Sequence, residues 1–494
     1  MPGANSRCKK GAPLQDGSGA TALVLSVVPV YKRDMRCFAR LCFLLFCFLA
    51  ATAADGRTRP LDFTTIRLGG KEPVVLIVGG IQGDEPGGFS AATLVATRYA
   101  VKNGAVWVVP NLNFPSIIMR SRGLNGDMNR KFAALDARDP DFSAVSRIQE
   151  LIRHPQVKLV LNLHDGSGYY REEKIDALRN PLRWGQSVII DQERMDGGVF
   201  MAELGREARQ VTEDVNSRLV QSLHKLHVHN TNTAAGDREM EKSLSWYAVR
   251  HGKAAFGLEA SKEFPVELRV YYHLCMVESL LRQAGIDFFR DFDLTPESIR
   301  QVLQADIEVS FAEKRVFLPL DNARPAIGAL PLPQNSAPVT SKPIMAVLPC
   351  RKNNEALCIH YGNRTLTRIR PDWREMDDSL SEVRVTVDGR EKLIRFGEVL
   401  PVAESLLVHR IQGFRVNVIG FPGRSDDDSG VTLRRQNFLK HYSVDRQGTL
   451  YRVEVYNKRR LAGMFLARFG APAQAAGRRD RLPAVPGPES ALGF

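Results

Sequence analysis

Two polar side chains stand three positions apart in a glycine-rich segment that follows an apolar run. Residues 74–88 read VVLIVGGIQGDEPGG, which places Gln82 and Glu85 in a turn that leads into a predicted helix. Side chains at positions i and i+3 of such a turn can converge on one ion, and glycines let the backbone approach it closely. A phosphate-binding loop would have a similar sequence. This segment alone therefore indicates an ion site but does not show whether the ion is a cation or an anion.

A histidine ends a later apolar run in the same way. Residues 161–170 read LNLHDGSGYY, so His164 lies at the C-terminal end of a predicted strand. Parallel strands present functional groups at that edge of a sheet. Because Gln82 and Glu85 follow a strand of the same kind, we expect the three side chains to meet at one edge.

Two further segments carry side chains suited to binding a carboxylate and moving a proton. In GLNGDMNRKF, at residues 123–132, Asn129 and Arg130 are adjacent and Arg122 comes shortly before them. A guanidinium binds a carboxylate through two hydrogen bonds, and a neighbouring carboxamide adds a neutral donor. In AAFGLEASKEF, Glu259 stands among apolar residues, where partial burial would raise its pKa toward the range of a general base.

The elements that must position these groups alternate between strand and helix. Short apolar, β-branched runs begin at positions 74, 105, 158, 187 and 254, and helical patterns cover 89–101, 145–154, 198–219 and 265–284. The runs are almost continuously apolar, which is typical of strands covered by helices on both faces. This pattern predicts an α/β domain at residues 55–292, with a sheet flanked by helices.

Beyond residue 292 the pattern becomes one of short alternating segments. It predicts two small antiparallel β domains, at 293–370 and 371–470, the second a β-sandwich of immunoglobulin-like type. The tail at 471–494, rich in Ala, Pro and Arg, is expected to be disordered. Cys350 and Cys358 flank a short polar segment, so they either close a hairpin as a disulfide or remain free thiols.

The N-terminal region resembles an export signal. Residues 35–54 combine a short basic start, an apolar stretch and small residues of the A-x-A type. We therefore expect a signal peptide, a start at Met35, an upstream extension at 1–34 and a periplasmic location; an uncleaved anchor is the alternative. The net charge of +13 is scattered and forms no basic stripe, which argues against nucleic-acid binding and favours a polyanionic envelope.

The segments QGDEPGG, GDMNRKF, HDGSGYY and EASKEF, in this order, resemble the zinc carboxypeptidases of the carboxypeptidase A-like family. More closely, they resemble the peptidoglycan D,L-carboxypeptidases that determine helical cell shape. The resemblance covers residues 74 to about 290 and implies a carboxypeptidase-like mixed sheet. It departs from the wider family at Gln82, where histidine is usual, although the shape-determining subfamily shares this glutamine.

The resemblance implies a role for each candidate residue. Gln82, Glu85 and His164 would hold zinc, Glu259 would act as general base, and Arg122 would stabilise the oxyanion, with Arg120 as the alternative. The terminal carboxylate of the substrate would be bound by Asn129 and Arg130. The implied substrate is the peptidoglycan stem L-Ala-γ-D-Glu-meso-diaminopimelate, trimmed to the dipeptide.

Other interpretations of the same residues remain open. An aspartoacylase-like deacylase could use the same metal ligands, and a murein-binding scaffold could retain the fold without activity. Envelope proteins could bind the β domains. The histidines of SLHKLHVHN, at positions 224, 227 and 229, could also bind metal, but packing or a pocket-lining role is the expected one.

Overall fold

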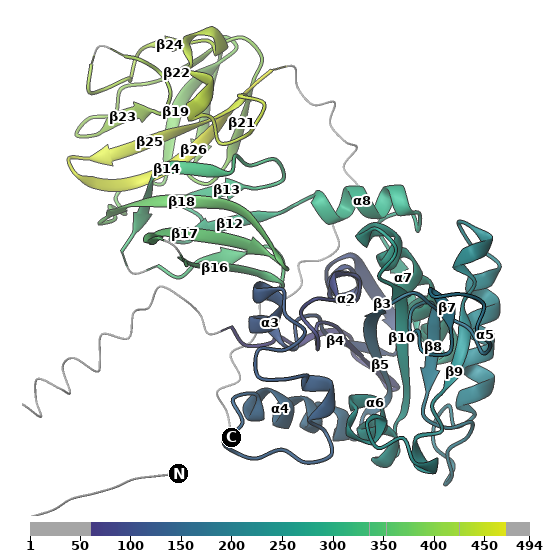
Figure 1. Cartoon of the computed structure of the whole chain (residues 1–494). Helices are drawn as coiled ribbons and strands as arrows, with labels where there is room; N and C mark the ends of the chain where they lie inside the picture. Colours follow the sequence, from purple (N-terminus) through teal and green to yellow (C-terminus); the bar gives the residue numbers. More distant parts are fainter. Residues whose placement is uncertain (1–60, 335, 352, 424, 471–494) are drawn as a thin grey trace, which may run out of the picture. The chain divides into compact units, whose positions relative to one another are not determined.

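The computed structural model describes residues 61–470 except 335, 352 and 424 (Figure 1). The expected upstream extension, signal peptide and C-terminal tail lie outside the described residues.

A seven-stranded mixed sheet forms the centre of the first domain. In spatial order its strands are β1 (Ile66–Gly69), β4 (Ala105–Val109), β2 (Val74–Val78), β5 (Val157–Gly166), β10 (Ala254–Ser261), β8 (Ser187–Ile190) and β9 (His227–Asn230). Strands β4, β2, β5 and β10 run parallel to one another, whereas β1 and β8 join them antiparallel. The mixed sheet is confirmed, and each strand expected from the apolar runs is present.

Helices cover both faces of this sheet. Every residue of β2 and β4 is buried, and because successive side chains of a strand point to opposite faces, both faces must be covered. The helices are α2 (Pro86–Arg98), α3 (Phe114–Met119), α4 (Phe142–Arg153), α5 (Leu204–Asn216), α6 (Leu244–Arg250) and α7 (Val266–Gln283). Helix α7 packs against both α2 and α5, so the spatial order of the three is α2–α7–α5.

The four expected helices are present with shifted bounds, and two of the shifts have a structural reason. The helix expected to end at 101 ends at Arg98, because the next residues form β3 (Tyr99–Asn103), which pairs with β11 (Asp287–Arg290). The helix expected from 198 begins at Leu204, after a turn in which Gly197, Gly198 and Met201 adopt positive φ. The short pieces of this domain are η1 (Met128–Arg130), β6 (Tyr169–Tyr170), β7 (Arg179–Asn180), η2 (Ser222–His224), η3 (Thr233–Ala235) and η4 (Met240–Lys242).

A helix that the sequence analysis did not predict follows the first domain. Thr295 caps α8 (Pro296–Gln304) by accepting a hydrogen bond from the backbone of Ser298, and α8 packs against α7. Its buried residues Ile299 and Leu303 belong to the core of the first domain. The region assigned to the first β domain therefore begins with a helix that completes the core of the first domain.

The remaining chain is built from small, mostly antiparallel sheets. The first β region holds β12 (Glu308–Phe311), β13 (Val316–Pro319), β14 (Ala326–Pro333), β15 (Val339–Thr340), β16 (Met345–Cys350), β17 (Asn353–Tyr361) and β18 (Arg364–Arg374). The second holds β19 (Glu382–Val387), β20 (Arg390–Arg395), β21 (Val399–Val402), β22 (Leu406–Val408), β23 (Arg415–Val418), β24 (Thr432–Leu433), η5 (Arg435–Asn437), η6 (Lys440–Tyr442), β25 (Leu450–Asn457) and β26 (Arg460–Phe469). Two four-stranded sheets of the second region share one core and form a sandwich.

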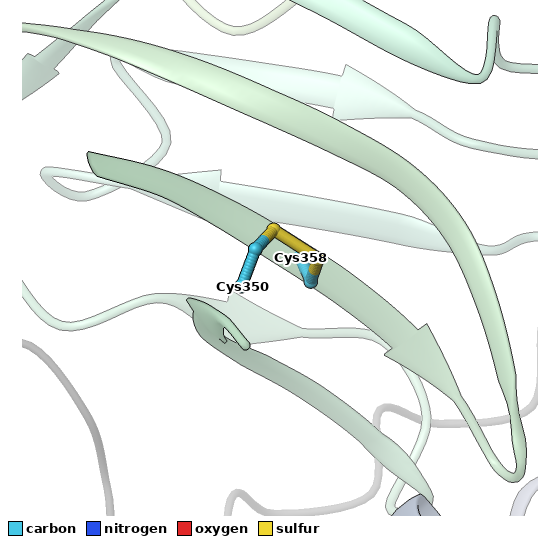
Figure 2. Close-up of a disulfide and its surroundings, with 2 residues drawn as sticks. All are labelled: Cys350 and Cys358. Carbon is cyan, nitrogen blue, oxygen red and sulfur yellow. A yellow bond between two sulfur atoms is a disulfide. The ribbon is translucent and has the colours of Figure 1, made fainter. Parts of the chain in front are cut away.

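The hairpin of β16 and β17 carries the disulfide. Cys350 and Cys358 are bonded to each other, as Figure 2 shows. The sequence left a disulfide and two free thiols as alternatives, and the structure has the disulfide.

The core of the first β region extends into its neighbours. Phe89 of α2 and Phe114 and Ile117 of α3 belong to the same buried cluster as residues of this region, among them Ile344. On the other side, Met464 of β26 belongs to it as well. One apolar cluster therefore joins the first domain, the first β region and the second β region.

Candidate active site

Gln82, Glu85 and His164 converge at the C-terminal edge of the sheet. The Nδ1 atom of His164 lies 3.1 Å from Gln82 Oε1 and 3.0 Å from Glu85 Oε2. The ligand atoms of a four-coordinate zinc ion lie about 3.3 Å apart, given bonds of about 2.0–2.1 Å. One Nδ1–H group cannot fully satisfy two acceptors, whereas a cation between the three atoms satisfies all of them. The donor set therefore fits one divalent metal ion.

Two glycines let this turn lie against its neighbours. A Cβ atom at Gly83 would lie 2.1 Å from the carbonyl carbon of Ser116 in α3, and one at Gly87 would lie 2.3 Å from an oxygen of Asp165. Asp165 instead accepts a hydrogen bond of 2.8 Å from the Gly87 backbone and contacts His273 and Arg269 of α7 at 3.0 and 3.2 Å. The fully buried Asp165 thereby ties the end of β5 to the start of α2, and so sets the distance between His164 and Glu85.

Asp127 orients the carboxamide of Gln82. The Nε2 atom of Gln82 donates to both oxygens of Asp127, at 2.8 and 2.9 Å, which turns Oε1 toward His164. Arg122 Nε donates to the same carboxylate at 3.0 Å. Burial alone would raise the pKa of Asp127, but the bonds from Gln82 and Arg122 bring it below its ordinary value. Sequence analysis missed this residue, although it stands inside the GDMNRKF segment.

Removing the Asp127 carboxylate is expected to weaken metal binding. In the Asp127→Ala variant the Gln82 amide loses the acceptor that fixes its orientation, and loss of such a partner costs about 10- to 100-fold in metal affinity. Competition with a chromophoric chelator for Zn²⁺ measures the change. Asp139→Ala, which removes a carboxylate paired with Lys131 in the same segment, is the control. Equal affinity of the Asp127→Ala variant and the wild type would exclude this role.

Glu259 faces the three converging side chains from the neighbouring strand. In the parallel pairing of β10 with β5, Glu259 stands directly opposite His164. Its side chain is buried, and Oε2 has no hydrogen-bond partner among the described residues. Burial, followed by the nearby carboxylates of Glu85 and Asp165, raises the pKa of Glu259 well above its ordinary value. Such a carboxyl is suited to accepting and returning a proton.

Cationic and amide side chains stand at the other side of the site. Arg122 lies 3.4 Å from Glu85 Oε1, while Arg130 pairs with the exposed Glu239 at 3.6 Å. Asn129 is held by its Oδ1, which accepts a hydrogen bond of 3.0 Å from the backbone of Leu244.

Arg120, the alternative to Arg122, points elsewhere. It ends α3 in a left-handed conformation, and its Nε donates to the backbone oxygen of Asn363 in the first β region. Of the two arginines, only Arg122 lines the site.

One cavity of about 200 Å³ contains all the candidate residues. Its lining includes Gln82, Glu85, Arg122, Asn129, Arg130, His164 and Glu259. Among the other lining residues that sequence analysis did not single out are Asn162, Trp184, Ser245 and Lys262. Of these, Asn162 had a signal: it is a polar residue that interrupts the apolar run from Leu159 to Leu163.

Two histidines of the segment at 224–229, His224 and His229, pack against aromatic rings. His224 Nδ1 lies 2.7 Å from the Tyr272 hydroxyl, and the ring of His229 stacks on Tyr170 with centroids 3.9 Å apart. Among residues 61–470, as far as they are described, no group of three His, Cys, Asp or Glu side chains could hold a metal. The converging set above contains only two such residues because its third donor is a glutamine.

Three tyrosines of this domain, Tyr169, Tyr170 and Tyr247, do not line the cavity. Tyr170 packs on His229, Tyr169 packs on Phe264, and Tyr247 lies between Phe132 and His251.

Two family models match this chain. The family described as "Carboxypeptidase controlling helical cell shape catalytic" matches residues 41–304, and "C-terminal domain of metallo-carboxypeptidase" matches residues 376–470. In the comparison with curated proteins, none matches significantly.

Solved structures of one protein resemble the chain over most of its length. The apo structure of the cell shape determinant protein Csd4 from Helicobacter pylori has a TM-score of 0.76 and 39% identity, covering 83% of this chain and 100% of that chain. Its tripeptide-bound structure gives the same values, a TM-score of 0.76 and 39% identity over 83% and 100% of the two chains. The mDAP-bound form, described as a D,L-carboxypeptidase, has a TM-score of 0.75 and 40% identity over 80% and 96%. The chain therefore belongs to the family of metallo-carboxypeptidases that control helical cell shape.

Proposed function

We propose that the protein is a zinc-dependent D,L-carboxypeptidase that removes meso-diaminopimelate from the stem L-Ala-γ-D-Glu-meso-diaminopimelate and leaves the dipeptide. One observation carries the proposal: a single cavity holds a metal-binding donor set, a buried glutamate and a carboxylate-binding pair. The tripeptide-bound and mDAP-bound structures of the relative support the choice of substrate. Trimming of these stems is how the enzyme acts on cell shape.

Each side chain has a role in this reaction. Gln82, Glu85 and His164 hold the ion, and a bound zinc ion supplies Lewis acidity that lowers the pKa of water and polarises a carbonyl. Glu259 accepts a proton from the water that attacks the scissile carbonyl carbon, and it passes this proton to the amine nitrogen as the C–N bond breaks. Arg122 stabilises the charge that develops on the carbonyl oxygen.

Substrate binding determines which bond is cut. Asn129 and Arg130 bind the terminal carboxylate, so that only the last peptide bond reaches Glu259. In a tetrapeptide the terminal carboxylate lies one residue further on. Binding of that carboxylate by Asn129 and Arg130 places a different peptide bond at Glu259, and the residue that would be released has the opposite chirality. The enzyme therefore acts after the stem has been trimmed to a tripeptide.

We further propose that the protein works in the periplasm. The export signal expected at residues 35–54 supports this location, and so does the Cys350–Cys358 disulfide, because such bonds persist in oxidising compartments. In the part of the chain that the structure describes, no helix is long and apolar enough to cross a bilayer.

Incubation with defined stem peptides tests the proposal. Purified protein loaded with zinc is mixed with tri-, tetra- and pentapeptide stems, with and without a chelator. The products are identified from their masses by mass spectrometry. We expect release of diaminopimelate from the tripeptide alone, its loss with the chelator and its return when zinc is added. Cleavage of an N-acyl amino acid but no stem would favour a deacylase, and binding of stems without any cleavage would favour a scaffold.

A further inference from the structure

Ser116 of α3 is a buried polar residue whose side chain holds the loop at residues 120–127, which carries Arg122. Ser116 is fully buried and does not line the cavity. Its Oγ accepts a hydrogen bond of 3.0 Å from the backbone N–H of Leu124. Because Leu124 comes two residues after Arg122, this bond fixes the chain on the C-terminal side of the arginine.

The backbone of Ser116 fixes the other side of the same loop. Arg120 ends α3 in a left-handed conformation, with a φ of 55°. The next residue, Ser121, donates its N–H to the carbonyl oxygen of Ser116 at 3.0 Å. A bond of this span is part of the Schellman motif, which ends many helices. Ser116 therefore binds the chain both before and after Arg122.

The same residue packs against the turn that carries two of the metal-binding side chains. Gly83 lies between Gln82 and Glu85, and a Cβ atom there would lie 2.1 Å from the carbonyl carbon of Ser116 and 2.2 Å from its carbonyl oxygen. The two backbones are thus in direct contact, and only a glycine allows this approach. Through Ser116, the loop of Arg122 is held at a fixed position relative to Gln82 and Glu85.

The side chain of Arg122 does not fix its own position. It is 51% exposed, and it contacts Asp127 at 3.0 Å and Glu85 at 3.4 Å. A long side chain loses rotamer freedom when it is held in one place, and ion pairs of half-exposed side chains offset that loss only weakly. The place of the guanidinium therefore depends on the backbone from which the side chain extends.

We propose that Ser116 is a positioning residue that holds Arg122 at the distance from Gln82 and Glu85 at which the guanidinium stabilises the carbonyl oxygen of the scissile bond. The bond from Leu124 to Oγ is the part of this arrangement that a side-chain substitution removes. The inference rests on the proposed function, in which Arg122 stabilises the developing charge. It adds that a helix residue outside the cavity determines how well Arg122 does so.

The Ser116→Ala variant tests this role, because it removes Oγ and keeps the backbone contacts. We expect kcat for L-Ala-γ-D-Glu-meso-diaminopimelate to fall about 10- to 100-fold, since a displacement of about 1 Å in a charge-stabilising group has an effect of that size. KM should stay within about threefold, because Asn129 and Arg130 still bind the substrate. Zinc affinity, measured by competition with a chromophoric chelator, should stay at the wild-type value.

A double-mutant cycle shows whether Ser116 acts through Arg122. Arg122→Ala lowers kcat by itself, and adding Ser116→Ala to it should lower kcat no further, because no guanidinium is left to misplace. A serine that only stabilises the fold would lower kcat by the same factor in both backgrounds.

The matched control is another fully buried serine. Ser279→Ala in α7 removes a hydroxyl that donates to Asp214 outside the cavity, and it should keep kcat within about twofold of the wild type. If Ser116→Ala does not fold, Ser116→Cys takes its place. The thiol nearly preserves the size of the side chain but is a weak acceptor, so the same pattern of kcat and KM is expected.

The outcomes distinguish this inference from the proposed function. Wild-type kcat in the Ser116 variant, equal losses in the two backgrounds, or loss of zinc binding would overturn the role of Ser116 and leave the carboxypeptidase activity standing. Wild-type turnover in Arg122→Ala would remove the charge-stabilising role of Arg122, and this inference with it. Failure of the wild type to cleave the tripeptide would overturn the proposed function itself.

Discussion

Replacing Glu259 with glutamine is expected to slow the chemical step by about 10²- to 10⁴-fold and to leave metal and substrate binding nearly intact. Glutamine has the same size as glutamate but cannot accept the proton of the attacking water. The Oε2 atom of Glu259 has no hydrogen-bond partner within the described part of the chain, so the substitution breaks no structural hydrogen bond seen at that atom. Single-turnover rates, zinc content and tripeptide affinity, measured on the same preparation, separate these effects.

The matched control lies in the same segment. Glu263→Gln removes an exposed carboxylate four residues further on and should leave the single-turnover rate within about twofold of the wild type, since exposed sites away from the chemistry change little. Unchanged turnover in Glu259→Gln would refute the general-base assignment. Loss of the metal from that variant would instead make Glu259 a ligand.

Replacing Arg130 with alanine is expected to lower kcat/KM by about 10²-fold, because the variant loses a charge-assisted contact that also positions the reacting carbonyl. The guanidinium is free for this contact: its only ion pair among the described residues is with the exposed Glu239, at 3.6 Å, and not with Asp127 or Asp165. The measurement compares the tripeptide with the same peptide amidated at its C-terminus. The wild type should discriminate strongly between the two, and the variant weakly.

A second arginine serves as the control for this experiment. Arg138→Ala removes an exposed guanidinium that pairs with Asp136 in the loop that follows, and it should retain strong discrimination. If Arg130→Ala discriminates against the amide as strongly as the wild type does, Arg130 only braces its loop and the carboxylate is bound elsewhere.

The sequence predicted the part of the fold that depends on local pattern. Continuous apolar runs are characteristic of strands buried on both faces, and the end of such a strand is where α/β sheets present functional groups. For that reason the meeting of Gln82, Glu85 and His164 could be expected before their distances were known. Glu259 was found by the same logic, as a charged residue in an apolar run.

Features that depend on distant contacts could not be predicted in this way. The residues of β3 continue a helical pattern and become a strand only because β11 offers a pairing edge from the far end of the domain. Asp127 was read as part of a motif, but its function depends on the direction of the Gln82 carboxamide, which only the folded chain defines. Asn162 interrupted an apolar run, yet the missing partner of its Oδ1 is visible only in the structure.

The apolar cluster that joins the three parts of the chain has a consequence for unfolding. Phe114 and Ile117 stand in α3, directly before the loop of Arg122, and they share that cluster with Ile344 of the first β region and Met464 of the sandwich. Unfolding of any one part exposes apolar surface that its neighbours had buried against it. Such coupling makes separate segments unfold as a single cooperative unit. Partial unfolding that begins in a β region, far along the sequence from the catalytic residues, therefore reaches the active-site loop.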